Sequence, residues 1–178
     1  MNLILRTFFV TMRALWASWR GRKLGPFDES VLPFRVWLND LDVNLHMNNG
    51  RYLTIMDLGR FDFLLRSGLW TQVRRQRWMP LVGAVVFRYK RSLQPFVRYD
   101  LHSRVLGWDD KWFYIEQRFL LGGELAGLGL VRALFRGRSG NVPPAEALRA
   151  AGYDVASPPL PEMVADWRRL ETAAGVGF

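Results

Sequence analysis

The order of secondary-structure patterns along the chain constrains its fold more than any other feature. A strand-like segment at Phe34–Asn39 precedes a long helical segment at about Gly50–Ser67, in which apolar residues recur on one face. Strand patterns follow at Leu81–Tyr89, Tyr99–Leu106, Trp112–Leu121 and Glu124–Phe135. A helix that buries one face against antiparallel strands gives an α+β layer arrangement. The sequence therefore predicts a roughly five-stranded antiparallel sheet curled around one long central helix.

Chain length and composition indicate one core with an extension at each end. The 178 residues, 49% of them hydrophobic, suffice for a single domain with a sizeable core. We expect a basic amphipathic helix in residues 1–24 and the α+β domain in residues 25–140. Residues 141–178 are rich in proline and alanine and are expected to form an extension with short helices at Pro143–Ala151 and Glu162–Ala173.

The residue types that are scarce exclude several kinds of chemistry. The chain has no cysteine, which excludes disulfides, thiolate catalysis and thiolate metal sites. Its two histidines, His46 and His102, do not favour a histidine-rich zinc site. We therefore expect neither a metal nor a cofactor.

The amino-terminal segment, residues 1–23, has the pattern of a helix that lies on a membrane surface. Arg6, Arg13 and Arg20 recur every seven residues and would form one basic stripe, and two of them interrupt the apolar stretch before it could span a bilayer. Another face gathers Ile4, Phe8, Met12, Leu15 and Trp19. We expect a cytoplasmic protein with peripheral contact to the inner membrane surface through this helix. The alternative is a helix that packs on its own domain or on a dimer partner.

The net charge of +9 and the sequence pI of about 10.8 favour anionic partners in general. The basic residues are scattered along the chain, and no helix-turn-helix, ribonucleoprotein or zinc-finger pattern accompanies them. A nucleic acid is therefore not an expected partner.

The most informative segment is the polar loop that precedes the long helix, Asp40–Tyr52, with the sequence DLDVNLHMNNGRY. Asn48 or Asn49 could cap the helix, and the backbone N–H groups at its start would suit a developing oxyanion. A carboxylate beside such donors can take a proton from water and direct the water at an acyl carbon. The alternative is a turn in which Asp and Asn side chains bond only their own backbone.

The loop, continued to DLDVNLHMNNGRYL, resembles the signature loop of the hotdog-fold thioesterases. It is similar to the plant acyl-carrier-protein thioesterases and to the wider 4-hydroxybenzoyl-CoA thioesterase superfamily. An LGWDD turn at Leu106–Asp110, followed by Phe113-Tyr114, and the PLPEMVADW run at Pro159–Trp167 resemble the thioesterase superfamily member six group. The likeness covers roughly Leu32–Trp167. It implies a hotdog fold, hydrolysis of an acyl-CoA or acyl-carrier-protein thioester, and a homodimer or larger homo-oligomer with the cleft between protomers.

The resemblance also implies roles for particular residues. Asp42 matches the catalytic aspartate, which acts as general base or, less commonly, as nucleophile. His46 would polarise water or the thioester carbonyl, and Asn44 would orient the pair. Oxyanion donors and substrate-positioning groups are expected at the helix start, at Asn49, Gly50, Arg51 and Tyr52.

The same loop and its surroundings leave other assignments open. Many relatives have glycine where this chain has Leu45, and relatives that use a glutamate on the central helix would be matched by Asp57. His46 could instead be a structural histidine, and Asp40 is expected to cap or to end a strand. A basic cluster at a strand end consists of Arg88, Lys90 and Arg91. It could contact coenzyme A phosphates or an acidic carrier, or it could be solvated surface.

Two further functions are compatible with the same fold. One is a noncatalytic, membrane-associated acyl-binding protein, and the other is hydratase or dehydratase chemistry. A carboxylate beside helix-end donors favours hydrolysis over simple lipid binding, because a lipid binder has little need of Asp42. The apolar residues around the helix would accept a fatty acyl tail, and an aromatic acyl group is also compatible.

Overall fold

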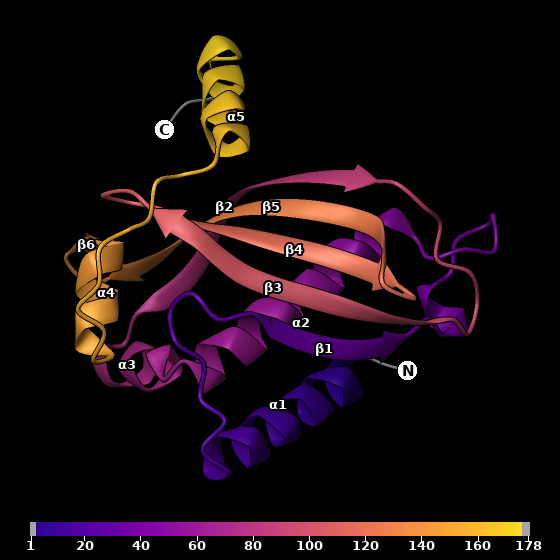
Figure 1. Ribbon diagram of the computed structural model, residues 1–178, viewed down its shortest axis with the longest axis horizontal. Helices are drawn as coiled ribbons and strands as arrows, with labels where there is room; N and C mark the ends of the chain where they lie inside the picture. The colour runs from indigo at the N-terminus through magenta and orange to yellow at the C-terminus, as the bar shows by residue number, and fades with distance from the viewer. Residues whose placement is uncertain (1–2, 176–178) are drawn as a thin grey trace.

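The computed structural model describes residues 3–175. Its sheet is antiparallel throughout and curls around the long helix α2 (Asn49–Arg66), which lies against one face (Figure 1). The strand order is β1-β3-β4-β5-β2, and a short β6 pairs with β5. The strands are β1 (Ser30–Arg35), β2 (Met79–Tyr89), β3 (Arg98–Trp108), β4 (Phe113–Leu121), β5 (Glu124–Gly137) and β6 (Gly140–Val142). This arrangement confirms the expected α+β hotdog architecture.

The remaining helices lie at the ends of the chain and around α2. They are α1 (Leu3–Trp19), the short 3-10 helix η1 (Leu38–Asp40), α3 (Leu69–Gln76), α4 (Pro144–Ala150) and α5 (Glu162–Ala173). α1 packs along α2, outside the layer formed by the sheet (Figure 1). The helices expected near both ends are present, although residues 1–2 and 176–178 of the expected terminal segments lie outside the described part.

α2 approaches the sheet closely because one of its residues has no side chain. A Cβ atom on Gly59 would lie 2.5 Å from Ser103 Oγ and 2.8 Å from Gln117 Nε2. The Gln117 side chain, buried in β4, donates to the Met56 carbonyl oxygen of α2 at 2.9 Å and to Ser103 Oγ at 2.8 Å. Its amide oxygen accepts a 2.6 Å hydrogen bond from Arg60. A polar network therefore fixes the middle of α2 to the sheet.

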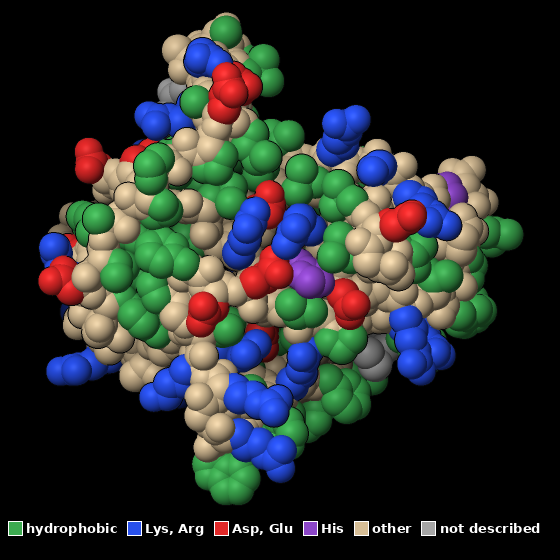
Figure 2. All heavy atoms as spheres, viewed as in Figure 1, with side chains coloured by type: hydrophobic (Ala, Val, Ile, Leu, Met, Phe, Trp, Pro, Cys, Tyr) green, Lys and Arg blue, Asp and Glu red, His purple; other side chains and the backbone are tan. Residues whose placement is uncertain are grey.

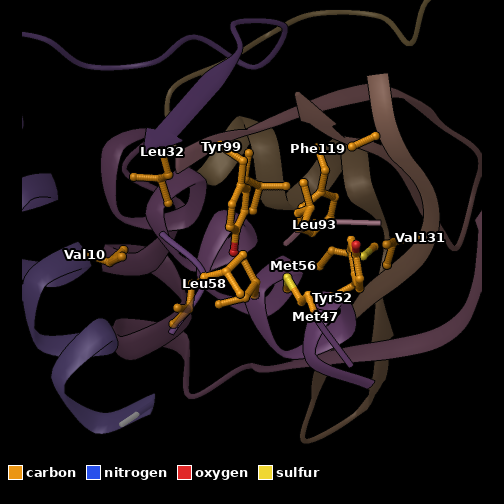
Figure 3. Close-up of a cluster of buried hydrophobic side chains, with 14 residues drawn as sticks. Val10, Leu32, Met47, Tyr52, Met56, Leu58, Leu93, Tyr99, Phe119 and Val131 are labelled. Atoms are coloured by element: carbon orange, nitrogen blue, oxygen red, sulfur yellow. The ribbon is translucent and has the colours of Figure 1, made fainter. Parts of the chain in front are cut away.

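Apolar packing surrounds this polar contact. The main cluster lies between α2 and the curled sheet, where Tyr52 and Met56 of the helix meet Tyr99 and Phe119 of the strands (Figure 3). The ring centroids of Tyr52 and Phe119 are 4.9 Å apart in an edge-on contact. Burial of such large rings is the main favourable contribution to folding.

Two expectations about local structure were wrong. The first strand spans Ser30–Arg35 rather than Phe34–Asn39, and the exposed Pro33 is tolerated because β1 is an edge strand. Arg6 does not share an exposed stripe with Arg13 and Arg20, because its side chain is buried against Asp40.

Candidate active site

The loop between η1 and α2 is a narrow turn held by backbone hydrogen bonds. Leu41 and Met47 form an isolated antiparallel bridge, and the Asp42 N–H donates to the His46 carbonyl oxygen at 3.0 Å. At its tip, Leu45 has a φ of 58°, in the left-handed region that glycine adopts without penalty. The glycine of many relatives therefore falls at a position whose backbone favours it.

The Asp42 carboxylate is oriented by this turn and remains accessible. Its Oδ1 accepts the Asn44 backbone N–H at 2.8 Å, and its Oδ2 lies 3.6 Å from His46 Nδ1. The two side chains retain 19% and 30% exposure, respectively. Asn44 thus meets Asp42 through its backbone, whereas its own side chain is exposed. The structure therefore brings together the three residues expected from the sequence.

The start of α2 lies directly after this turn. Asn48 is the capping residue, and its side-chain oxygen accepts the Gly50 N–H at 2.9 Å. The Arg51 N–H donates to the Asn48 carbonyl oxygen at 2.9 Å. The positive end of the helix therefore points toward the loop that carries Asp42.

Arg51 is engaged in the structure of the loop. Its Nε lies 3.2 Å from the buried Asp40 carboxylate, and its NH2 group donates to the Asn39 carbonyl oxygen at 2.8 Å. Asp40 also accepts the Trp37 N–H at 2.8 Å, which confirms the capping role expected for it. These contacts hold the base of the loop.

A small polar cavity of about 120 Å³ opens beside His46. Its wall joins the start of α2 to the end of β2, because the Tyr89 hydroxyl donates to the Asn49 carbonyl oxygen at 3.1 Å. Burial raises the pKa of both Tyr52 and Tyr89 above the ordinary tyrosine value. The lining residues are His46, Met47, Asn49, Tyr52, Tyr89, Lys90, Arg91 and Ser92.

The members of the basic cluster that follows β2 differ in position. Lys90 and Arg91 line the polar cavity, and Arg91 lies 3.4 Å from Glu124 in an exposed ion pair. Arg88 is exposed on β2 and does not line that cavity. The sequence placed these residues on one strand end but gave no sign that this end meets the loop of Asp42.

Asp57 lies away from this cavity. Its side chain is exposed and forms an ion pair with Arg60, one turn further along α2. Burial lowers the pKa of Arg60, and the Asp57 charge opposes that shift. The geometry therefore assigns Asp57 to the helix surface.

A second, apolar cavity of about 90 Å³ lies near the other end of α2. Its accessible wall is almost entirely hydrocarbon and includes Phe63 and Leu64 of α2, Leu81 and Val82 of β2, and Phe113 of β4. Sequence reasoning located apolar residues around the helix but not this cavity.

Residues 3–175 offer neither a metal-binding cluster nor a membrane-spanning helix. They contain no group of three histidine, cysteine, aspartate or glutamate side chains placed to hold a metal ion. Among these same residues, no helix has the length and apolar character needed to cross a bilayer.

A helix wrapped by a curled antiparallel sheet, with an acidic loop at the helix start, defines a hotdog-fold protein of the thioesterase type. Residues 36–168 match the thioesterase-like superfamily, and the chain belongs to that family. Protein THEM6 of Danio rerio is 40% identical over 124 residues, a match that covers 66% of this chain and 61% of that protein. This chain thus spans less than two thirds of the length of that relative.

Solved structures agree on the fold. YbaW from Escherichia coli has a TM-score of 0.64 and 20% identity, with 68% of this chain and 94% of that one covered. The gentisyl-coenzyme A thioesterase BH1999 has a TM-score of 0.59 and 20% identity, with 68% and 98% covered. At these identities the likeness concerns the fold alone.

Proposed function

We propose that this protein hydrolyses acyl thioesters, with Asp42 as general base. Asp42 takes a proton from water as the water oxygen bonds to the thioester carbonyl carbon, which gives a tetrahedral oxyanion. The oxyanion then collapses, the carbon–sulfur bond breaks, and the proton held by Asp42 passes to the departing thiolate. The products are a free acid and a thiol, and no cofactor takes part.

One observation carries this proposal: the Asp42 carboxylate is held by the Asn44 N–H and lies 3.6 Å from His46, which lines a polar cavity beside the start of α2. A partly exposed carboxylate fixed in this way can bind a water molecule without losing contact with solvent. His46, which lines the cavity, is placed to orient that water or the carbonyl group.

Oxyanion stabilisation is assigned to the backbone at the start of α2. The Gly50 N–H donates to the side-chain oxygen of Asn48 at 2.9 Å. The Asn48 side chain must therefore turn aside before the thioester oxygen can accept the Gly50 N–H. Preorganised backbone donors and the helix dipole then favour the developing negative charge. Asn49 and Tyr52 position the substrate from the cavity wall.

The thiol part of the substrate carries phosphate, whether it is coenzyme A or the arm of a carrier protein. Lys90 and Arg91 are exposed beside the polar cavity and can pair with phosphate oxygens. Arg88, further along β2, extends the same positive surface. Coenzyme A and an acidic carrier protein are both anionic, and this positive surface fits either of them.

The site is assigned to a homodimer formed along β2. This edge strand exposes Met79, Val82, Val86 and Tyr89, which would favour aggregation if they were left uncovered. Two β2 strands paired about a two-fold axis run in opposite directions. The start of one strand, which lines the apolar cavity, would then lie beside the end of the partner strand, which lines the polar cavity.

This pairing supplies a place for the acyl group. The thioester carbonyl would lie near Asp42 of one protomer while its tail enters the apolar cavity of the other. A cavity whose accessible wall is hydrocarbon favours a fatty acyl tail, because hydroxyl groups on an aromatic acid would lose their hydrogen bonds to water there. The substrate class we propose is therefore a fatty acyl thioester.

The test is hydrolysis of acyl-CoAs from short to long chains, with aromatic acyl-CoAs for comparison. Asp42→Asn keeps the shape but removes the base, and we expect kcat/KM to fall by about two to four orders of magnitude. Asp154→Asn, at an exposed residue distant in sequence from the loop, is the matched control and should leave the rate unchanged. Equal rates for wild type and Asp42→Asn would contradict the assignment of the base.

A second measurement addresses the alternative of a noncatalytic acyl-binding protein. If the folded wild type binds acyl-CoA in calorimetry but hydrolyses neither acyl-CoA nor acyl-carrier-protein thioesters, the binding function replaces the proposed one.

Light scattering tests the proposed dimer separately. Val82→Lys combined with Val86→Lys should give a monomer, whereas Leu170→Lys on α5 should remain a dimer.

A further inference from the structure

α1 exposes its large apolar side chains and buries its small ones. Its inner face consists of Arg6, Val10, Ala14 and Ala17, which recur at the helical spacing of three to four residues. Nine large hydrophobic side chains face outward: Leu3, Ile4, Leu5, Phe8, Phe9, Met12, Leu15, Trp16 and Trp19. A helix at the edge of a globular domain usually shows the opposite distribution. We call this outward set the α1 apolar face.

The orientation of α1 is fixed by specific contacts. The buried Arg6 guanidinium is paired with the buried Asp40 carboxylate and also donates to the Arg35 carbonyl oxygen at 3.2 Å. The small residues Ala14 and Ala17 allow α1 to lie close against its neighbour α2. A rotation of the helix that buried its apolar face would separate Arg6 from Asp40 and leave that buried carboxylate with Arg51 alone, so the outward set stays outward.

Positive charge borders the α1 apolar face. Arg13, Arg20, Arg22 and Lys23 are exposed, and no acidic residue occurs between Leu3 and Phe27. The Arg20 guanidinium carbon lies 4.0 Å from the Trp16 ring centroid. Figure 2 shows basic and hydrophobic side chains together over α1, at the bottom of the view.

The apolar side chains and the bordering cations together indicate what covers the α1 apolar face. A second copy of the same face would bring like charges together, which is costly across an interface. An anionic bilayer supplies both hydrocarbon for the apolar side chains and phosphates for the cations. Tryptophan, with an apolar ring and an N–H donor, suits the boundary between these two layers.

We propose that α1 docks the protein on an anionic lipid bilayer, with the α1 apolar face in the acyl boundary and the four exposed cations on lipid phosphates. The interaction goes beyond thioester hydrolysis and does not depend on it. Because Arg6 joins the docked helix to Asp40, the loop that carries Asp42 is held at a fixed position relative to the bilayer.

The experiment is co-sedimentation of the full chain with vesicles. Phosphatidylcholine vesicles are compared with vesicles of phosphatidylcholine and phosphatidylglycerol in equal parts. We expect binding to the mixed vesicles that weakens as salt is raised. Phe8→Glu should weaken it by about tenfold or more, since it removes an apolar side chain from the bilayer. Arg13→Gln should weaken it by about fivefold.

Matched controls lie elsewhere on the surface. Leu170→Glu changes an exposed leucine of α5, and Arg75→Gln changes an exposed arginine of α3; both should bind as the wild type does. Absence of sedimentation by the folded wild type, or equal binding of Phe8→Glu and Leu170→Glu, would overturn the proposal. A change of Phe8→Glu from dimer to monomer in light scattering would also overturn it, because a second copy would then be the occupant.

Discussion

The guanidinium of Arg6 and the carboxylate of Asp40 form an ion pair in which both side chains are buried, at 2% and 1% exposure. Removing one partner of such a pair leaves a charge without compensation, at a cost of about 3–5 kcal/mol. We expect Arg6→Met to lower the free energy of unfolding by about 3 kcal/mol, the lower end of that range. Arg51, with its Nε 3.2 Å from Asp40, retains part of the compensation. Urea denaturation measures the change.

The control for this change is Arg13→Met on the same helix, where the side chain is exposed. It should alter stability by less than about 0.5 kcal/mol. Adding Asp40→Asn to Arg6→Met should recover part of the loss, because the buried carboxylate is then removed and the charge left without it, on Arg51, is 28% exposed to solvent. Similar losses for Arg6→Met and Arg13→Met would show that the buried pair does not carry the energy assigned to it.

Leu45 is strained by its backbone, with a φ of 58° and an exposed side chain that gains little from packing. A left-handed conformation costs an L-residue about 1–2 kcal/mol, and glycine avoids that cost while losing about 0.5–1 kcal/mol of chain entropy. Leu45→Gly should therefore leave the thermal midpoint unchanged or raise it slightly. Leu53→Gly, at an exposed position inside α2, should lower it, and a similar drop in both variants would contradict this account.

Gly59 provides the space in which α2 meets the sheet. Alanine is the better helix former by about 1 kcal/mol, but its Cβ would lie 2.5 Å from Ser103 Oγ and 2.7 Å from a methyl carbon of Leu101. We expect Gly59→Ala to destabilise the protein by about 1–3 kcal/mol, as overpacking does. Chemical denaturation checks the sign. A gain in stability would show that α2 can move away from the strands at little cost.

Asp109 makes the fold sensitive to acid. Burial alone would raise the pKa of Asp109, but hydrogen bonds from the Lys111 and Trp112 N–H groups and the Tyr114 hydroxyl outweigh it, so the pKa is lowered. Its stabilising contribution is thus complete above the unfolded pKa of about 3.9 and is lost as pH falls through the lower folded value. Burial, followed by the Asp109 hydrogen bond, also raises the pKa of Tyr114, to about 12.

Asp109→Asn should therefore lower stability at neutral pH by about 1.5–3 kcal/mol. The difference from the wild type should shrink below about pH 4. Urea midpoints from neutral pH down to about pH 3 measure this convergence. Asp110→Asn, at the exposed neighbouring position, serves as the control and should follow the wild type throughout. A constant gap at every pH would exclude an effect of the Asp109 charge.

The sequence predicts elements well where periodicity and capping agree. The bounds of α5 were predicted as Glu162–Ala173, and Asn48 was one of two expected caps of α2. The prediction failed at β1, because the apolar alternation of Phe34, Val36 and Leu38 continues although the chain leaves the regular ladder after Arg35. The Val36 N–H and carbonyl groups instead bond to the segment just before β3, which no local pattern reveals.

Local sequence predicted one part of the candidate site and missed the part that depends on long-range contacts. Asp42, Asn44 and His46 lie within five residues of one another, so local sequence sufficed to group them. The opposite wall of the cavity, Tyr89–Ser92, meets the loop through a contact between residues 40 positions apart. The burial of Arg6 likewise depends on a contact with a residue distant in sequence, Asp40. Such contacts follow from how the sheet curls, which periodicity does not encode.

The hydrogen bond from Gln117 to the Met56 carbonyl oxygen fixes the position of α2 relative to the sheet. A helix anchored to the sheet at mid-length cannot slide along its own axis without breaking that bond. We therefore expect the polar cavity to admit a ligand through small adjustments of the turn at residues 41–47, and not through movement of α2. In hydrogen–deuterium exchange, the amides in the middle of α2 should accordingly exchange more slowly than the amides of the turn at residues 41–47.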